Sequence, residues 1–193
     1  MKVLVACESS ATVRRAFERH GCEAWSCDTL PSEVPGNHYQ CDVREVLGQR
    51  WDLIIAHPPC TRLCNSGVRW LQERSLWDEM REAAEFFKLF LRLGKTPVAI
   101  ENPIMHGYAK KIVGCNQTQT VQPWMFGHGE TKATCLWLKY LPKLLPTNVV
   151  DGREQRVWSM PPGPDRWKER SRTLQGFADA MADQWTKFLL NSK

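Results

Sequence analysis

Two reactive side chains each stand where an apolar run is ended by proline. Cys60 follows the run 53–56 and two consecutive prolines, and Glu101 closes the run 97–101 just before Asn102 and a further proline. A cysteine thiol can act as a nucleophile, and a carboxyl group can exchange protons with a bound molecule. Because parallel strands end at one edge of a sheet, where ligands bind, we expect Cys60 and Glu101 to lie together at that edge.

The segments around these residues alternate between strand and helix. Strands are predicted at residues 2–6, 23–27, 53–56, 97–101, 118–122 and 134–138, and helices at 12–20, about 43–48, about 76–93 and 173–190. The second strand ends at Asp28, so three strands deliver polar groups to one edge. This order predicts an open α/β sheet with its ligand site at the carboxyl ends of the strands.

Length and composition favour one domain over residues 1–193. The chain carries a formal net charge of +5, which permits an anionic partner such as nucleic acid without requiring one. The apolar run at the amino terminus is too short for a signal peptide or a membrane span, so we expect a cytoplasmic protein without a membrane partner. The eight cysteines are scattered through apolar stretches and are expected to be mostly reduced and buried.

The positive charge is concentrated after the strand that ends in Glu101. Residues 104–150 contain five lysines and one glutamate, a net charge of +4. The wider segment 104–167 is rich in glycine and proline, and it is predicted to be a small irregular region that faces the substrate. Its candidate phosphate contacts are Lys110, Lys111 and Lys132.

Taken together, these motifs resemble those of the DNA cytosine carbon-5 methyltransferases, especially short phage-type members. His57-Pro58-Pro59-Cys60 is similar to the Pro-Cys nucleophile motif of that family, and Ile100-Glu101-Asn102 is similar to its Glu-Asn motif. The resemblance implies a Rossmann-like S-adenosylmethionine-dependent methyltransferase fold and methyl transfer to carbon 5 of cytosine in DNA. If the chain is phage-encoded, it would act in the cytoplasm of a bacterial host.

The resemblance also assigns roles to the two reactive residues. Cys60 would add as a thiolate to carbon 6 of the pyrimidine, which makes carbon 5 nucleophilic, and Glu101 would hold and protonate ring nitrogen 3. We therefore expect burial to raise the pKa of Glu101 and the site to lower that of Cys60. Asn102 and Lys132 are expected beside the substrate.

For the cofactor, S-adenosylmethionine, the resemblance points to the loop after the first strand. The methionine part would lie against Cys7, Glu8 and Ser9, the ribose against Asp28, and the adenine beside Asp42. Pro58 is also expected to contact the cofactor. The family usually has a Phe-x-Gly-x-Gly turn in this loop, whereas this chain has no glycine there.

Several alternatives stay open. The acceptor could be a free pyrimidine nucleotide, or the chain could be an inactive DNA-binding module with the same fold. Asp28 and Asp42 could merely cap turns or helices. His57, Cys60 and Cys64 have spacing that could bind zinc, but no tight Cys-x-x-Cys pair and no fourth ligand are evident, so no metal is expected. Four aromatic residues could stack on bases, although the core is favoured for most: Trp124, Phe126, Trp137 and Tyr140.

Overall fold

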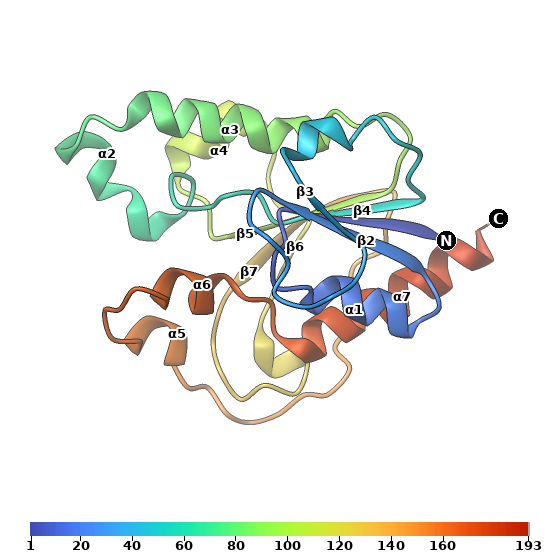
Figure 1. Ribbon diagram of the computed structural model, residues 1–193. Coiled ribbons are helices and arrows are strands. Elements are labelled where there is room, and N and C mark those ends of the chain that lie inside the picture. Colours follow the sequence, from blue (N-terminus) through green and yellow to red (C-terminus); the bar gives the residue numbers. More distant parts are fainter. Residues whose placement is uncertain (193) are drawn as a thin grey trace.

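A seven-stranded sheet lies at the centre of the computed structural model, which describes residues 1–192 (Figure 1). The strands are β1 (Lys2–Ala6), β2 (Glu23–Asp28), β3 (His38–Gln40), β4 (Leu53–Ala56), β5 (Val98–Pro103), β6 (Gln119–Val121) and β7 (Thr134–Lys139). Their order is β3-β2-β1-β4-β5-β7-β6, with β7 antiparallel to both β5 and β6. This is the arrangement of the Rossmann-like methyltransferase fold, so the predicted fold class is confirmed.

Helices cover both faces of the sheet (Figure 1). The α-helices are α1 (Thr12–Arg19), α2 (Arg69–Glu73), α3 (Trp77–Leu91), α4 (Gly107–Val113), α5 (Arg156–Ser159), α6 (Arg166–Ser171) and α7 (Gln175–Asn191). Short 3-10 turns are η1 (Val43–Glu45), η2 (Asn65–Gly67) and η3 (Pro123–Met125). Helices α3 and α4 pack together, and α1 packs on α7 along the opposite face.

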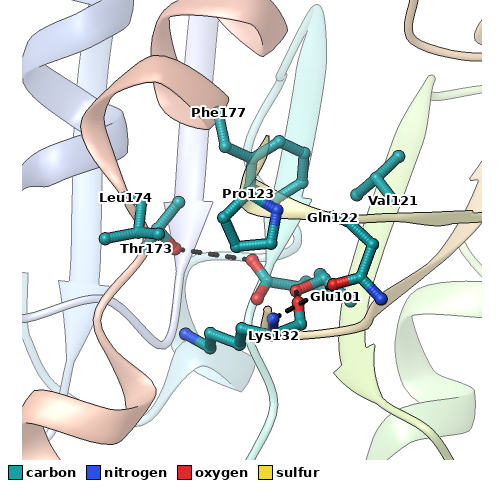
Figure 2. Close-up of a pocket in the computed structure, with 9 residues that line it drawn as sticks. Glu101, Val121, Gln122, Pro123, Lys132, Thr173, Leu174 and Phe177 are labelled. Carbon is teal, nitrogen blue, oxygen red and sulfur yellow. Dashed lines mark hydrogen bonds between the residues drawn. The ribbon is translucent and has the colours of Figure 1, made fainter. Parts of the chain in front are cut away.

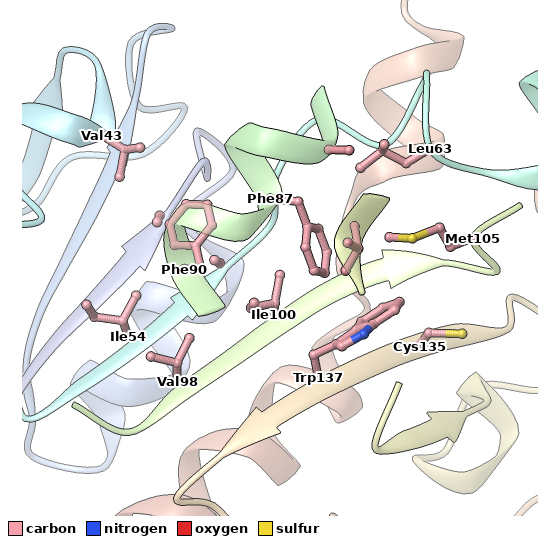
Figure 3. Packing of buried hydrophobic residues seen from close by; sticks show 14 of the residues in the cluster. Val43, Ile54, Leu63, Phe87, Phe90, Val98, Ile100, Met105, Cys135 and Trp137 are labelled. Atoms are coloured by element: carbon pink, nitrogen blue, oxygen red, sulfur yellow. The ribbon is translucent and has the colours of Figure 1, made fainter. Parts of the chain in front are cut away.

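Two hydrophobic cores follow from the alternation of side chains along the strands. Ile54, Val98 and Ile100 point towards α3, where they meet Phe87 and Phe90 (Figure 3). The intervening residues of the same strands point the other way and pack against α1 and α7. Because each inner strand is buried on both faces, its sequence is a continuous apolar run rather than an alternating one.

Most predicted elements are present, with differences in the second half of the chain. Strand β5 does not stop at Glu101 but runs on to Pro103, which pairs with Thr134 of β7. Proline is tolerated there because it is the last residue of the ladder, where no further N–H donor is needed. The short strand β3 and helices α2, α4, α5 and α6 are not predicted from the pattern. In α7, Phe177, Met181 and Trp185 are buried as their spacing suggests, whereas Phe188 is 40% exposed.

The cysteines and aromatic residues only partly follow the expectation of burial. All eight cysteines are free, and four are buried: Cys22, Cys27, Cys64 and Cys135. Phe126 and Trp137 lie in the core, while Tyr140 is exposed and Trp124 lies against the guanidinium of Arg153. Within residues 1–192, no helix is both long and apolar enough to cross a membrane.

The carboxyl edge of the parallel strands is flanked by two projecting segments. In Figure 1 this edge faces left, with α2 above it and α5 and α6 below it. The lower segment is tied to the body by Glu33, which lies in the loop after β2 and pairs with Lys168 at 3.0 Å and Arg172 at 2.7 Å. Two segments outside the sheet therefore flank the edge where a ligand would bind.

Candidate active site

The ends of β4 and β5 bring two side chains into direct contact. The register pairs Ala56 with Ile100, so the next residues, His57 and Glu101, stand side by side. Nδ1 of His57 lies 2.9 Å from Oε2 of Glu101, and both side chains are largely buried, with 15% and 11% of their surface exposed. The strand ends thus form a buried ion pair at the edge where a ligand would bind.

Cys60 lies in a tight turn that follows His57 and the two prolines. The Cys60 carbonyl accepts hydrogen bonds from the backbone amides of Leu63 and Cys64, which closes the turn. The turn is fastened to the segment after β5, because the amide of His106 donates to the Leu63 carbonyl. Leu63 itself is fully buried. This anchoring fixes the nucleophile candidate next to the strand that carries Glu101.

Further polar groups surround Glu101 in the pocket of Figure 2. The hydroxyl of Thr173, just before α7, donates to Oε2 of Glu101 at 3.4 Å. Lys132 lines the same pocket, together with Gln122, whose side-chain oxygen accepts from the Lys132 amide at 3.1 Å. Val121, Pro123 and Phe177 supply the apolar part of the wall. The pocket thus combines hydrogen-bonding groups with an apolar wall beside Glu101.

The Lys132 side chain is turned inwards rather than displayed on the surface. Its Nζ donates to the backbone carbonyls of Arg172 at 2.9 Å and Ser171 at 3.5 Å. Burial lowers the pKa of Lys132, while the negative charge of Glu101 opposes that change. Lys132 therefore lies in one cluster with Cys60 and Glu101. This position differs from the outer phosphate contact that the sequence led us to expect.

The ionisation of Glu101 is the reverse of the expectation. Burial opposes its charge, but the neighbouring His57 imidazolium and Lys132 outweigh burial, so the pKa of Glu101 is lowered. Correspondingly, burial disfavours charge on His57, yet the carboxylates of Glu101 and Glu8 raise the pKa of the imidazole. The predicted rise in the pKa of Glu101 is thus wrong for the free protein, because a buried cation that the prediction did not consider is in contact with the carboxyl group.

The expectation for Cys60 is reversed as well. A hydrogen bond with the Cys64 thiol, burial and the charge of Glu101 together raise the pKa of Cys60. The same hydrogen bond lowers the pKa of Cys64 to about 5, with support from the Ser66 hydroxyl and from the amides of Ser66 and Gly67. In the free protein the pair therefore keeps its proton on Cys60 and its negative charge on Cys64.

A second group of residues lies at the carboxyl ends of β1, β2 and β3. Burial raises the pKa of the Cys7 thiol, and the carboxylates of Asp28 and Asp42 raise it further, which places both acids close to Cys7. The Asp28 carboxylate accepts from the Leu30 amide, and Asp42 caps η1 and pairs with Arg44 at 2.8 Å. The candidate ribose and adenine residues thus converge on the end of β1.

The glycine-free loop after β1 keeps a turn that usually calls for glycine. Cys7 and Ala11 adopt positive φ angles of 60° and 58°. Each such residue costs about 1–2 kcal/mol and persists because its surroundings enforce it. Glu8 caps α1, accepting from the amides of Val13 at 2.7 Å and Arg14 at 3.1 Å, while Ser9 accepts from the Glu33 amide. The sharp turn is therefore formed without glycine.

Three predicted substrate residues are not brought to Cys60 and Glu101. Asn102 follows Glu101 in β5, so its side chain lies on the opposite face, where it is buried and its Oδ1 has no hydrogen-bond partner among the described residues. Lys110 and Lys111 are in the last turn of α4, which packs against α3. Of the predicted set, Cys60, Glu101 and Lys132 form the cluster.

His57 and Thr173 are members of the cluster that the motifs did not assign to the reaction. For His57 the sequence holds a usable signal, because it directly follows one predicted strand as Glu101 ends the next. No comparable signal exists for Thr173, which is 72 residues from Glu101 and reaches it only through the packing of α7. Among residues 1–192, no group of three or more potential metal ligands is close enough to hold an ion.

No protein-family model and no curated protein matches the sequence. Among solved structures, the chain is similar to the methyltransferase EhMeth of Entamoeba histolytica, with a TM-score of 0.49 and 12% sequence identity. The superposition covers 81% of this chain and 58% of EhMeth, so the chain spans less than two thirds of the length of that protein.

Proposed function

We propose that the protein transfers a methyl group to carbon 5 of cytosine in DNA through a covalent adduct with Cys60. The observation that supports this most directly is the meeting of three groups at the carboxyl edge. The charge of Glu101 acts on the Cys60 thiol, and Glu101 and Lys132 line one pocket. An acid and a cation in a pocket with an apolar wall, beside the turn that carries a nucleophile, suit addition to a polar aromatic ring.

The first step would be attack of the Cys60 sulfur on carbon 6 of the base. As the sulfur–carbon bond forms, the Cys60 proton passes to the Cys64 thiolate, which balances the charge. Electron density pushed into the ring is accommodated at ring nitrogen 3, which takes a proton from Glu101, while carbon 5 becomes nucleophilic. After methylation, water takes the carbon-5 proton, and Cys60 leaves as a thiolate that regains its proton from Cys64, which restores the aromatic ring.

S-adenosylmethionine would supply the methyl group when bound. The residues at the ends of β1 to β3 fit such a molecule, because two carboxylates converge there and can accept hydrogen bonds from ribose hydroxyls and an adenine amino group. The turn between Cys7 and Ala11 takes the backbone through two left-handed residues despite its missing glycines. Asp28 and Asp42 would therefore hold the nucleoside, Cys7, Glu8 and Ser9 would contact the methionine part, and Pro58 would also contact the cofactor.

Basic and aromatic side chains flank the carboxyl edge of the sheet, and they favour a polymer substrate. The segment after the Cys60 turn carries Arg69, Trp70 and Arg74. The guanidinium groups of Arg69 and Arg74 lie 4.2 and 4.1 Å from the centroid of the Trp70 ring. Below the edge, Trp158 and Trp167 are 77% and 61% exposed. Cations and exposed aromatic rings beside a half-buried nucleophile suit a nucleic acid whose target base is extruded into the pocket.

Methyl transfer tests this proposal directly. The protein is incubated with labelled S-adenosylmethionine and, at equal cytosine concentration, with duplex DNA, single-stranded DNA or deoxycytidine monophosphate. We expect incorporation into DNA, none with Cys60→Ala, and a covalent Cys60 adduct with DNA that contains 5-fluorocytosine. Equal or better activity on the monophosphate would favour the nucleotide alternative, and DNA binding without transfer would favour an inactive module. Active enzyme that forms no adduct would exclude the covalent mechanism.

A further inference from the structure

The carboxyl group that faces the candidate base is held in the wrong protonation state for its role. His57 and Lys132 keep Glu101 ionised in the free protein. A carboxylate can only accept hydrogen bonds, and ring nitrogen 3 of cytosine is also an acceptor. Direct contact between the two would leave two acceptors facing each other in a buried site, which is unfavourable. A proton must therefore reach Glu101 before or during the addition of Cys60.

His57 is the group placed to supply that proton. Its Nδ1 is 2.9 Å from Oε2 of Glu101, with no space for an intervening molecule. Both side chains are fixed, because each follows or ends a strand in the centre of the sheet and both are largely buried. The other ring nitrogen, Nε2, is buried and has no hydrogen-bond partner among the described residues. An imidazolium with one N–H unsatisfied gives up its proton more readily than a fully bonded one.

Charged groups from every neighbouring element bear on this pair. Glu8, after β1, favours a charged His57, while Lys132, before β7, opposes it. Cys60, after β4, is protonated at rest and so adds no charge near Lys132. Thr173, before α7, donates a hydrogen bond to Glu101 but has no proton to release at neutral pH. Among the described residues, only His57 combines direct contact with Glu101 and an ionisation near neutral pH.

Resting on the proposed function, we propose that His57 is a positioning residue that stores the proton which Glu101 delivers to the base. When the base enters and Cys60 adds to carbon 6, the proton on Nδ1 of His57 moves to Glu101, and Glu101 protonates ring nitrogen 3. His57 becomes neutral, and its proton cancels the negative charge that the Cys60 sulfur brings into the ring. The Cys60 proton neutralises the Cys64 thiolate, so the total charge of the site does not change. When Cys60 leaves, ring nitrogen 3 returns the proton to the pair.

The pH profile of methyl transfer tests this role. In the wild type, kcat/KM falls as the pH rises through the raised pKa of His57, because the pair then holds no proton. In His57→Gln the amide can still donate to Glu101 but stores no proton. The falling limb should therefore move to lower pH, and the rate at pH 8 should drop by about 10²–10⁴-fold, the usual contribution of a positioned acid. A limb that stays in place would overturn the proposal.

A matched variant separates proton storage from simple orientation. Thr173→Val removes the other hydrogen bond to Glu101 and leaves His57 unchanged. We expect a lower rate with the falling limb at the wild-type pH. If both variants shift the limb alike, His57 only orients Glu101, and the storage role is rejected. The affinity for S-adenosylmethionine is measured alongside, so that a folding defect in either variant is recognised.

A second measurement does not depend on activity. The protein has five histidines, and the nuclear magnetic resonance titration of each ring can be followed with labelled histidine. In Glu101→Gln one titration curve should move to lower pH, because the carboxylate that raises the pKa of His57 is gone. Five unchanged curves would overturn the proposal even if His57→Gln fails to fold. Wild-type protein without methyl transfer would instead reject the proposed function, whatever the titration shows.

Discussion

Cys60 and Cys64 lie at the two ends of the turn that follows β4, where the Cys64 amide donates to the Cys60 carbonyl at 3.0 Å. Interaction with Cys64 raises the pKa of the Cys60 thiol, and interaction with Cys60 helps to lower the pKa of Cys64 to about 5, because the amides of Ser66 and Gly67 support a thiolate on Cys64 and not on Cys60. The nucleophile candidate is thus protonated at rest, next to a thiolate that can accept its proton. Activation of Cys60 therefore depends on Cys64 as well as on Cys60 itself.

We predict that Cys64→Ala makes Cys60 more reactive in the free protein. Without its main cause, the elevation of the Cys60 pKa diminishes, and each unit of that decrease gives about tenfold more thiolate at a given pH below the pKa. The rate of Cys60 alkylation by iodoacetamide, followed by peptide mass spectrometry, should rise at least about tenfold at pH 8. Cys115→Ala, at an exposed cysteine outside the pair, should leave the rate unchanged. An unaltered rate in Cys64→Ala would show that the pair is not coupled.

Asp28 is predicted to contribute directly to cofactor binding. Asp28→Ala should weaken the affinity for S-adenosylmethionine by about 1–3 kcal/mol, the cost of leaving buried hydroxyl groups without a carboxylate partner. Calorimetry measures the change, with Asp151→Ala, at an exposed acid in a loop, as the control. If the two variants bind alike, Asp28 serves only the turn in which it accepts from the Leu30 amide.

Gly36 should be intolerant of any side chain. It has a φ of 142°, and a Cβ atom there would overlap the guanidinium of Arg14. Arg14 is fully buried and donates to the carbonyls of Val34, Pro35 and Asn37, so it holds the loop that follows Asp28. Gly36→Ala is expected to lower the free energy of unfolding by about 2 kcal/mol.

Urea denaturation checks this prediction with a control at another loop glycine. Gly48→Ala adds the same methyl group where no heavy atom lies within 4 Å. It should change the free energy of unfolding by less than about 0.5 kcal/mol, as surface substitutions usually do. Equal effects at the two positions would show that Arg14 does not depend on the space beside Gly36.

The link between Glu33 and the segment before α7 should depend on pH. Burial would raise the pKa of Glu33, but hydrogen bonds and charge from Arg172 and Lys168 lower it. Since the folded-state pKa lies below the unfolded one, the stabilisation is present above the usual glutamate pKa and disappears as pH falls through the folded value. Glu33→Gln should cost about 1 kcal/mol at pH 7, a modest figure because solvent screens the pair.

The difference in unfolding free energy between wild type and Glu33→Gln should shrink steadily as pH is lowered below about 4. It should also shrink in about 0.5 M salt, which screens partly exposed ion pairs. Glu23→Gln, at an exposed glutamate that accepts from the Trp25 ring nitrogen, serves as the control. A constant difference from pH 7 to pH 3 would mean that shape, not charge, maintains the contact.

The sequence reveals the central strands and the meeting of Cys60 with Glu101 because both depend on local signals. Buried parallel strands are apolar runs, and prolines mark where β4 ends and β5 approaches its end. The helices α4, α5 and α6 escape prediction because they are short and lack a long apolar face. Their presence follows from packing and ion pairs with distant residues, such as Glu33 with Arg172.

The charge states at the site could not be predicted from the motifs for a similar reason. Lys132 has a basic side chain in a basic segment, which suggests a surface contact, yet carbonyls about 40 residues away draw it inwards. The ionisation of Glu101 depends on the register between β4 and β5, which brings His57 against it. Residue types thus indicate which groups react, whereas tertiary contacts decide which of them carries the proton.

The last prediction concerns the surface that holds the substrate. In the segment 104–150, Lys132 and Lys139 donate to backbone carbonyls. Fewer lysines are therefore available there to contact phosphates than the composition suggests. Arg69 begins α2 and Arg74 directly follows it; both are exposed, and neither is in an ion pair among the described residues. We expect these arginines, rather than the α4 lysines, to contact phosphates beside the extruded base.

Salt dependence measures those contacts, because each neutralised phosphate of duplex DNA contributes a slope of about −0.9 in log affinity against log salt. Arg69→Ala combined with Arg74→Ala should flatten the slope by about 2, whereas Lys110→Ala combined with Lys111→Ala, on the helix packed against α3, should change it by less than about 1. The opposite ranking would return the phosphate-binding role to the lysines. If neither pair alters the slope and deoxycytidine monophosphate is methylated as well as DNA, the substrate is a nucleotide and the flanking segments serve another purpose.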